Sequence, residues 1–127
     1  MIQALLEEDP VVVVWWATEV ECASAIARLE REATLNSEST REALDRMDAL
    51  ASGWHEIQPV ESVRRTARRL LRVHALRAAD SLQLAAATIA SEAHPESLEI
   101  VSLDDRLIGA ARREGFPVTD LATPPER

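Results

Sequence analysis

Three acidic side chains stand out as candidates for chemistry, because each lies at the end of a segment expected to form a strand or a helix. They are Glu21 in VECASAIARL, Asp80 in LRAADSLQLAAA and Asp104 in VSLDDRL. Carboxylates that converge at one edge of a sheet supply the oxygen ligands that a hard cation such as Mg²⁺ requires. A bound divalent ion lowers the pKa of its water and offsets charge on a phosphate. The sequence therefore predicts a metal-dependent phosphoryl-transfer or hydrolysis reaction.

The elements that must position these acids alternate between strands and helices. Apolar runs predict strands, buried on both faces, over 11–16 and 98–103, with a shorter strand at 54–60 and an edge strand at 116–119. Helices are expected at 2–8, 18–32, 39–53, 78–93 and 105–113, and a further helix directly after the strand at 54–60 carries the apolar stripe Val63, Ala67, Leu70 and Leu71. This order predicts a three-layer α/β/α fold with a mainly parallel sheet. Ligands bind beyond the carboxyl ends of such strands, where Glu21 and Asp104 are expected.

Capping motifs predict where several helices begin and end. Thr18 and Glu21 have the spacing of a capping box, and so do Ser39 and Glu42. Gly115 is expected to end the last helix in the left-handed conformation.

The composition limits the class of protein. With 127 residues, 46% of them hydrophobic, the chain is expected to form one domain over 1–127, with a loose tail at 120–127. The formal charge of −8 argues against a generally basic coat for nucleic acid, although a local basic face can still hold a phosphate backbone. One cysteine, Cys22, permits no intrachain disulfide and fits a reducing cytoplasm. No apolar stretch approaches the roughly 20 residues of a membrane span.

The acidic segments, taken with VSLDDRLIGAARREGF, resemble the PIN domain, and most closely the VapC-type toxin ribonucleases of bacterial toxin–antitoxin pairs. The resemblance covers 5–118 in the order of the family. Glu21 matches the acid at the start of the helix after strand two, and Asp80 matches the Asp of the D-A-x-x-x-A helix. Asp104 matches the Asp of the T-x-D-x-x-L segment, with Ser102 in place of the threonine and Leu107 as the leucine.

The resemblance implies a PIN-like fold and an endoribonuclease activity. Glu21, Asp80 and Asp104 would be the catalytic residues that bind Mg²⁺ or Mn²⁺ for RNA cleavage, with Ser102 orienting Asp104. Contacts to RNA are assigned to two arginines, Arg72 and Arg77. The implied partners are an RNA substrate, a cognate antitoxin that covers the acidic site, and a second copy of the chain in a homodimer, all in the cytoplasm and away from membranes.

One departure from the family concerns its first strand. Family members begin with a strand that ends in an Asp, of the form D-T-S-A-L, and this chain lacks it. The loss removes one metal ligand and leaves the apolar edges of 11–16 and 98–103 unpaired. We expect that the chain starts late relative to the natural gene product. The alternative to a late start is that the remaining strands close up or pair between subunits. The alternative function is a non-catalytic or truncated PIN-like binding module that keeps the partner surface without a complete metal site.

The acids also have structural interpretations, which would make the chain a plain α/β interaction protein. Glu21 would complete the capping box of Thr18. Asp80 would be a first-turn acid that the helix dipole favours. Asp104 and Asp105 form a pair of which one is expected to cap the following helix.

Other residues suited to RNA binding have structural interpretations as well. Trp15 and Trp16 are expected in the buried strand rather than on a base-stacking platform. A run of five arginines is either a phosphate-binding ridge or, as we favour, a solvated helix face paired with acids. These arginines are Arg64, Arg65, Arg68, Arg69 and Arg72.

Overall fold

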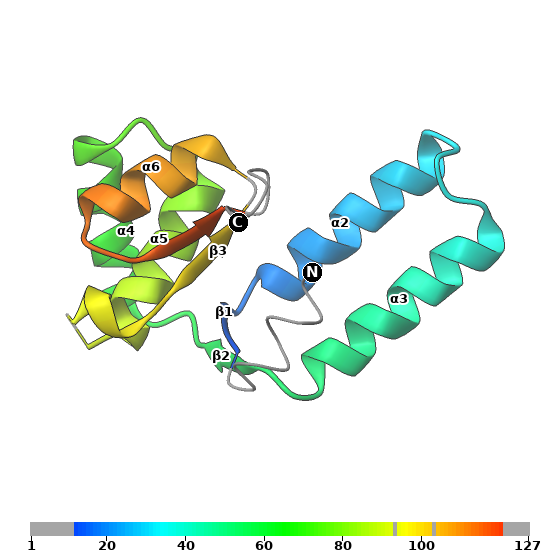
Figure 1. Ribbon diagram of the computed structural model, residues 1–127, viewed down its shortest axis with the longest axis horizontal. Helices are drawn as coiled ribbons and strands as arrows, with labels where there is room; N and C mark the ends of the chain where they lie inside the picture. The colour runs from blue at the N-terminus through cyan, green and yellow to red at the C-terminus, as the bar shows by residue number, and fades with distance from the viewer. Residues whose placement is uncertain (1–11, 93, 103, 121–127) are drawn as a thin grey trace, which may run out of the picture. The chain divides into compact units, whose positions relative to one another are not determined.

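The computed structural model describes residues 12–92, 94–102 and 104–120, and its element order is drawn in Figure 1. The chain forms two compact units, 1–56 and 57–127, called unit 1 and unit 2 below. The helix expected at 2–8 and the tail beyond residue 120 lie outside the described residues. A single domain over 1–127 stays a prediction.

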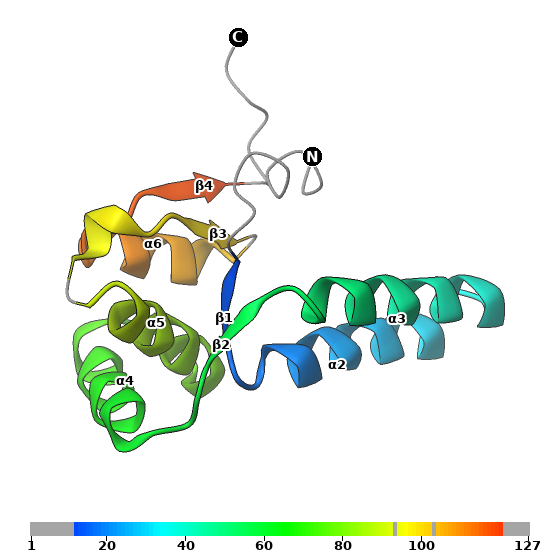
Figure 2. The same cartoon turned by 90° about the horizontal axis from the view of Figure 1, so that it is seen from below.

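Unit 1 contains a long helical hairpin. Strand β1 (Val13–Trp15) leads into α2 (Thr18–Arg31), and α3 (Ser37–Ala51) runs back beside it toward β2 (His55–Ile57) in both ribbon views (Figures 1 and 2). The two strands form a two-stranded sheet, in which the His55 N–H donates to the Val12 carbonyl at 2.8 Å. The hairpin therefore starts and ends at paired strands.

The start of α3 at Ser37 is two residues earlier than the sequence predicted. Asn36 is the N-cap: its side chain accepts from the Ser39 N–H at 2.8 Å, and the Ser39 hydroxyl accepts from the Asn36 N–H at 2.9 Å. The predicted box of Ser39 and Glu42 is wrong, because Asn36 offers an equally good capping oxygen three residues before Ser39.

The predicted capping box of Thr18 and Glu21 is also wrong. Helix α2 begins at Thr18, and its N-cap residue is Ala17, which has no side-chain cap. The backbone of Ala17 is already helical, with φ −81° and ψ −4°. An N-cap side chain needs a non-helical backbone to reach back to the helix, so Thr18 comes one residue too late to serve.

The strands are less buried than their apolar sequences predicted. In β1 only Trp15 is buried, and the next residue, Trp16, is 50% exposed outside the strand. In β3 (Ile100–Ser102), Val101 is 48% exposed. The expected burial is therefore confirmed for Trp15 and wrong for Trp16 and Val101, and these strands are not buried on both faces. The described strands form two-stranded sheets, which bury less of each strand than one sheet covered by helices on both faces.

Unit 2 is built from α4 (Glu61–Val73), α5 (Ala78–Ala90), a short 3₁₀ turn (Pro95–Ser97), β3, α6 (Asp105–Arg113) and β4 (Val118–Asp120). Strands β3 and β4 are parallel, with Ile100 opposite Val118, as expected for this fold class. The bounds predicted for α6 are confirmed. Gly115 follows it with φ +95°, the left-handed conformation predicted for the helix end.

The core of unit 2 lies between its helices. In Figure 2 the β3–β4 pair, α6, α5 and α4 follow one another as successive layers of this unit, and α4 packs closely on α5. Alanines let these helix backbones approach, while a few larger side chains fill the space between them. The buried set comprises Val63, Ala67, Leu70, Leu84, Ala85, Ala86, Leu107, Ile108, Ala110, Ala111 and Phe116.

Neighbouring leucines on α4 test this core. Leu70 is 0% exposed and Leu71 is 42% exposed. Leu70→Ala should lower the free energy of unfolding by roughly 2–5 kcal/mol, because it removes buried contacts and leaves a cavity. Leu71→Ala should change it by less than about 1 kcal/mol. Urea unfolding followed by circular dichroism measures both variants, and equal losses would contradict the described packing of α4.

Candidate functional site

Asp104 stands between a strand and a helix and caps the helix. Strand β3 ends two residues earlier, and Asp104 is the N-cap residue of α6. Its Oδ1 atom accepts the backbone N–H of Arg106 at 2.9 Å and that of Leu107 at 3.1 Å. Both bonds end on Oδ1, so Oδ2 takes no part in the cap. The cap therefore holds the carboxylate in place while one oxygen stays outside it.

Ser102 contacts Asp104 through the backbone. The Ser102 hydroxyl accepts the Asp104 N–H at 3.0 Å, so it helps to fix the turn from β3 into α6 without touching the carboxylate. Asp105 is the first residue of α6 and is exposed. Of the two adjacent acids, Asp104 is the one that caps the helix.

Asp80 lies in the first turn of α5 and is half-buried. Burial raises the pKa of the Asp80 carboxyl, and the charge of Asp104 raises it further. The positive charges of Arg77 and Arg106 lower this pKa but do not cancel the rise. The structure thus joins Asp80 and Asp104 in one electrostatic cluster, called the acidic pair below, with an arginine associated with each helix start.

The acidic pair offers carboxylate oxygens that a cation could bind. Two nearby carboxylates disfavour each other's ionised form, and a positive charge between or beside them removes that penalty. Oxygen donors of this kind fit Mg²⁺ or Mn²⁺, which prefer carboxylates, carbonyls and water. Arg77 and Arg106 supply part of the positive charge within the chain itself.

Glu21 belongs to unit 1, whereas the acidic pair belongs to unit 2. It is half-buried in the first turn of α2, where its N–H donates to the Ala17 carbonyl at 3.0 Å. Burial raises the pKa of the neighbouring Cys22 thiol, and the charge of Glu21 raises it further. Among the described residues, no group of three or more His, Cys, Asp or Glu side chains is placed to hold a metal ion. The structure brings Asp80 and Asp104 together, and a site that includes Glu21 stays a prediction.

The arginines predicted to contact RNA lie at neighbouring helix ends. Arg72 is exposed in the last turn of α4, and Arg77 is the exposed N-cap residue of α5. Arg77 acts electrostatically on Asp80, which associates it with the acidic pair.

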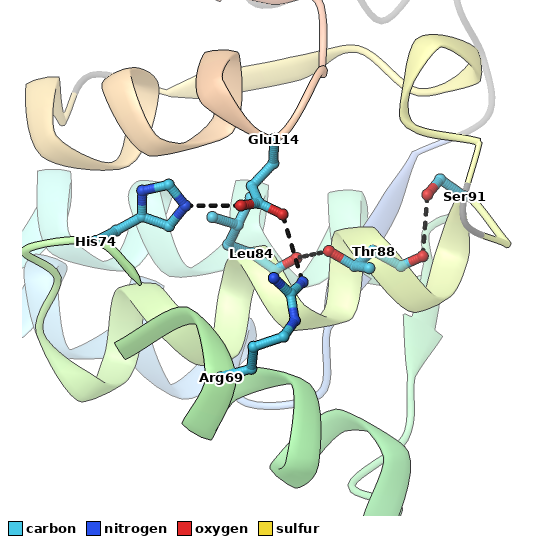
Figure 3. Close-up of polar contacts among 6 residues, drawn as sticks. All are labelled: Arg69, His74, Leu84, Thr88, Ser91 and Glu114. Carbon is cyan, nitrogen blue, oxygen red and sulfur yellow. Dashed lines mark hydrogen bonds and ion pairs between the residues drawn. The ribbon is translucent and has the colours of Figure 1, made fainter. Parts of the chain in front are cut away.

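A second charged cluster joins α4 to the end of α6, and sequence reasoning missed it. The buried His74 ring meets Glu114 with Nε2 at 2.8 Å from Oε2, and the Arg69 guanidinium donates to Oε1 at 3.4 Å (Figure 3). Burial of Glu114 opposes its ionisation, but the hydrogen bond from His74 and the charge of Arg69 outweigh this and lower its pKa. His74 and Arg69 lie 40 and 45 residues from Glu114 in the sequence, so no local sequence pattern predicts these contacts.

This cluster has a structural role. Glu114 is the C-cap residue of α6 and His74 that of α4, so the contact fixes the end of one helix against the end of the other. Figure 3 also shows how hydroxyl groups bond back along α5: Thr88 donates to the Leu84 carbonyl, and Ser91 donates to the Thr88 carbonyl. These bonds satisfy the Thr88 and Ser91 hydroxyl groups within the second half of α5.

Glu114→Gln should destabilise the protein in a pH-dependent way. Because the folded-state pKa of Glu114 is lowered, its charge stabilises the fold above the ordinary pKa of a glutamate, about 4.3. That contribution disappears as the pH falls through the lowered folded-state pKa. The variant should lose on the order of 1–2 kcal/mol at pH 7 and progressively less below pH 4.

Urea unfolding at several pH values measures this loss. Glu61→Gln is the matched control, because Glu61 forms an exposed pair with Arg64 at 3.1 Å and should contribute little at any pH. A loss for Glu114→Gln that is the same at pH 3 and pH 7 would show that the charge of Glu114 does not stabilise the fold.

Comparison with known proteins gives no relatives: the scan against protein-family models, the search of curated proteins and the search of solved structures each found no match. No helix in the described part of the chain has the length and apolar character needed to cross a membrane.

Proposed function

We propose that this chain is a metal-dependent endoribonuclease of the PIN and VapC toxin kind, which cleaves RNA phosphodiester bonds. The acidic pair is the observation that carries the proposal. Asp80 and Asp104 come from helix starts far apart in sequence, and the pKa of the Asp80 carboxyl is raised by burial and, in addition, by the charge of Asp104. Ionisable groups whose pKa is shifted by burial and by a neighbouring charge concentrate at functional sites.

In this proposal the side chains of the pair hold Mg²⁺ or Mn²⁺. When bound, the ion would supply an activated water and offset charge on the scissile phosphate. Asp104 would present Oδ2, which the helix cap leaves out, and Ser102 would keep the turn before α6 in place. Arg77 and Arg106 act on Asp80 electrostatically, so their guanidinium groups are suited to orient a phosphate beside it.

The remaining parts of the proposal concern the wider assembly. Glu21 would be a third acid of the site, and the complete sheet would be the mainly parallel centre of a three-layer α/β/α domain. The protein would act in the cytoplasm as a homodimer, and a cognate antitoxin would inhibit it by covering the acidic pair. These points are supported by the resemblance of the acidic segments to the PIN family, whose motifs occur in the same order along the chain.

A second candidate is a binding module without catalysis. The favouring observation is that Arg77 and Arg106 already lower the pKa of Asp80, so the chain offsets part of the repulsion without a metal. Such a module would keep the surface that binds a partner and would not respond to divalent ions.

Substitution of the acidic pair tests the catalytic proposal. Asp80→Asn should reduce Mn²⁺-dependent cleavage of RNA by at least about 100-fold, because it removes a ligand and a negative charge from the site. Asp104→Asn should do the same while preserving the fold, since asparagine caps helices as well as aspartate. The measurement is the cleavage rate of a labelled RNA with Mn²⁺ and with EDTA.

Asp105→Asn is the matched control. It neutralises the exposed neighbour of Asp104 and should leave the cleavage rate within a few fold of the unaltered chain. Cleavage that persists in Asp80→Asn, or in EDTA, would exclude the proposed site. An unaltered chain that binds partners but never cleaves RNA would favour the binding module.

A further inference from the structure

The charged residues of the chain are divided unevenly between its units. Residues 1–56 contain twelve acidic residues and four arginines, a net charge of −8, whereas residues 57–127 contain ten of each and are neutral overall. The acidity of the whole protein is thus a property of unit 1. Unit 2 is able to present a basic surface despite the net charge of the chain.

Five arginines of unit 2 lie on one face of α4. All of them are exposed, and the positions opposite them on the same helix, Val63, Ala67 and Leu70, are buried. At about 100° per residue they cover roughly 140° of the helix circumference, and every position from 64 to 72 in that arc is an arginine. This set, called the arginine stripe, comprises Arg64, Arg65, Arg68, Arg69 and Arg72.

Most of the arginine stripe has no acid partner. Arg64 pairs with Glu61 at 3.1 Å, and Arg69 pairs with Glu114 at 3.4 Å. In the described part of the chain no carboxylate lies within ion-pair distance of Arg65, Arg68 or Arg72. The acid-paired face that the sequence favoured is therefore wrong for the middle of the stripe, where three positive charges stand side by side without compensation.

We propose that the arginine stripe binds the phosphate backbone of single-stranded RNA. Arg64, Arg68 and Arg72 follow one another at about 6 Å along the helix axis, which gives a row of charges roughly 12 Å long. A guanidinium group binds phosphate oxygens in a bidentate manner. The choice of RNA rests on the proposed function, because the same unit carries the acidic pair.

An acidic protein segment fits the stripe less well. The centre of a protein interface is usually apolar and poor in charge, with a charged rim. Here the order is reversed: the centre is made of arginines, and the exposed apolar residues Leu71 and Val73 stand on either side of the arc. A phosphate backbone needs only a row of positive charges, and it contributes binding that is independent of sequence.

The test is RNA binding without catalysis, measured by fluorescence anisotropy of a labelled oligouridylate in EDTA. Arg65→Gln, Arg68→Gln and Arg72→Gln are combined in one variant, which keeps the two paired arginines and a similar helix propensity. The affinity should fall at least tenfold. The slope of log K against log salt should become shallower by about 2, since each phosphate contact to a single strand contributes about 0.7.

Two further variants make the result specific. Arg28→Gln, Arg41→Gln and Arg46→Gln remove the same charge from exposed positions of unit 1 and should leave the affinity within about twofold. Arg65→Lys, Arg68→Lys and Arg72→Lys keep the charge and should restore the salt slope. The proposal would be overturned if both glutamine variants lost the same affinity for the oligouridylate, or if neither lost any. It would also be overturned if the lysine variant did not restore the salt slope. A last contradicting result is binding of polyglutamate that depends on the stripe while binding of oligouridylate does not.

The failure of this proposal is distinguishable from failure of the nuclease. If RNA binding depends on the arginine stripe but no Mn²⁺-dependent cleavage occurs, the proposed nuclease activity is rejected and the proposed RNA-binding surface is retained. If cleavage depends on Asp80 but RNA binding does not depend on the arginine stripe, the nuclease proposal is retained and the proposed RNA-binding surface is rejected.

Discussion

The cost of ionising Asp80 is the constraint on which the proposed function of unit 2 depends, because burial and the charge of Asp104 both raise the pKa of its carboxyl. Asp80 lies in the first turn of α5 and Asp104 is the N-cap residue of α6, two positions where the helix dipole favours negative charge. Burial of Asp80 opposes its ionisation, and the charge of Asp104 adds to this cost, so the pKa of the Asp80 carboxyl is raised. Three things can lower the cost of the negative charge on Asp80: a proton on its carboxyl, the positive charges of Arg77 and Arg106, or a bound divalent cation. In the proposed function a divalent cation takes this part.

The rest of unit 2 keeps the two acids from moving apart. Alanines on α5 and α6 let these helices pack closely, and Leu70 and Leu84 fill the interior beside them. The contact of His74 with Glu114 joins the ends of α4 and α6. At the other end of α6, the cap by Asp104 and the bond to Ser102 fix the turn out of β3. Separation of the acids would thus require breaking core packing as well as polar contacts.

Local sequence patterns predicted the elements of unit 2 better than the contacts between them. The period of apolar residues located α4, α5 and α6, and Gly115 marked the end of α6, because these signals act over a few residues. The start of α3 was missed because Asn36 and Ser39 compete for the same role. The burial of Trp16 and Val101 was overestimated because apolar runs report preference for the interior, whereas actual burial depends on neighbouring strands. The contact between His74 and Glu114 depends on tertiary packing and leaves no local signal.

For the candidate site, the sequence indicated which acids to consider, and the structure related two of them. Asp80 and Asp104 are 24 positions apart, and the packing of α5 against α6 lets the charge of Asp104 raise the pKa of Asp80. The capping role of Asp104, which was an alternative to metal binding, is compatible with it, since the cap uses one carboxylate oxygen. The arginine stripe followed from helical spacing, but its unpaired centre required knowledge of where the acids lie.

The most direct test of the central claim is a titration of the Asp80 carboxyl by carbon-detected NMR, in the unaltered chain and in Asp104→Asn, each with and without Mg²⁺. The account predicts a pKa for Asp80 above the ordinary range of an aspartate, a lower pKa in Asp104→Asn, and a lower pKa again when Mg²⁺ is added to the unaltered chain. An Asp80 pKa that is ordinary, and unchanged by either the substitution or the ion, would contradict it.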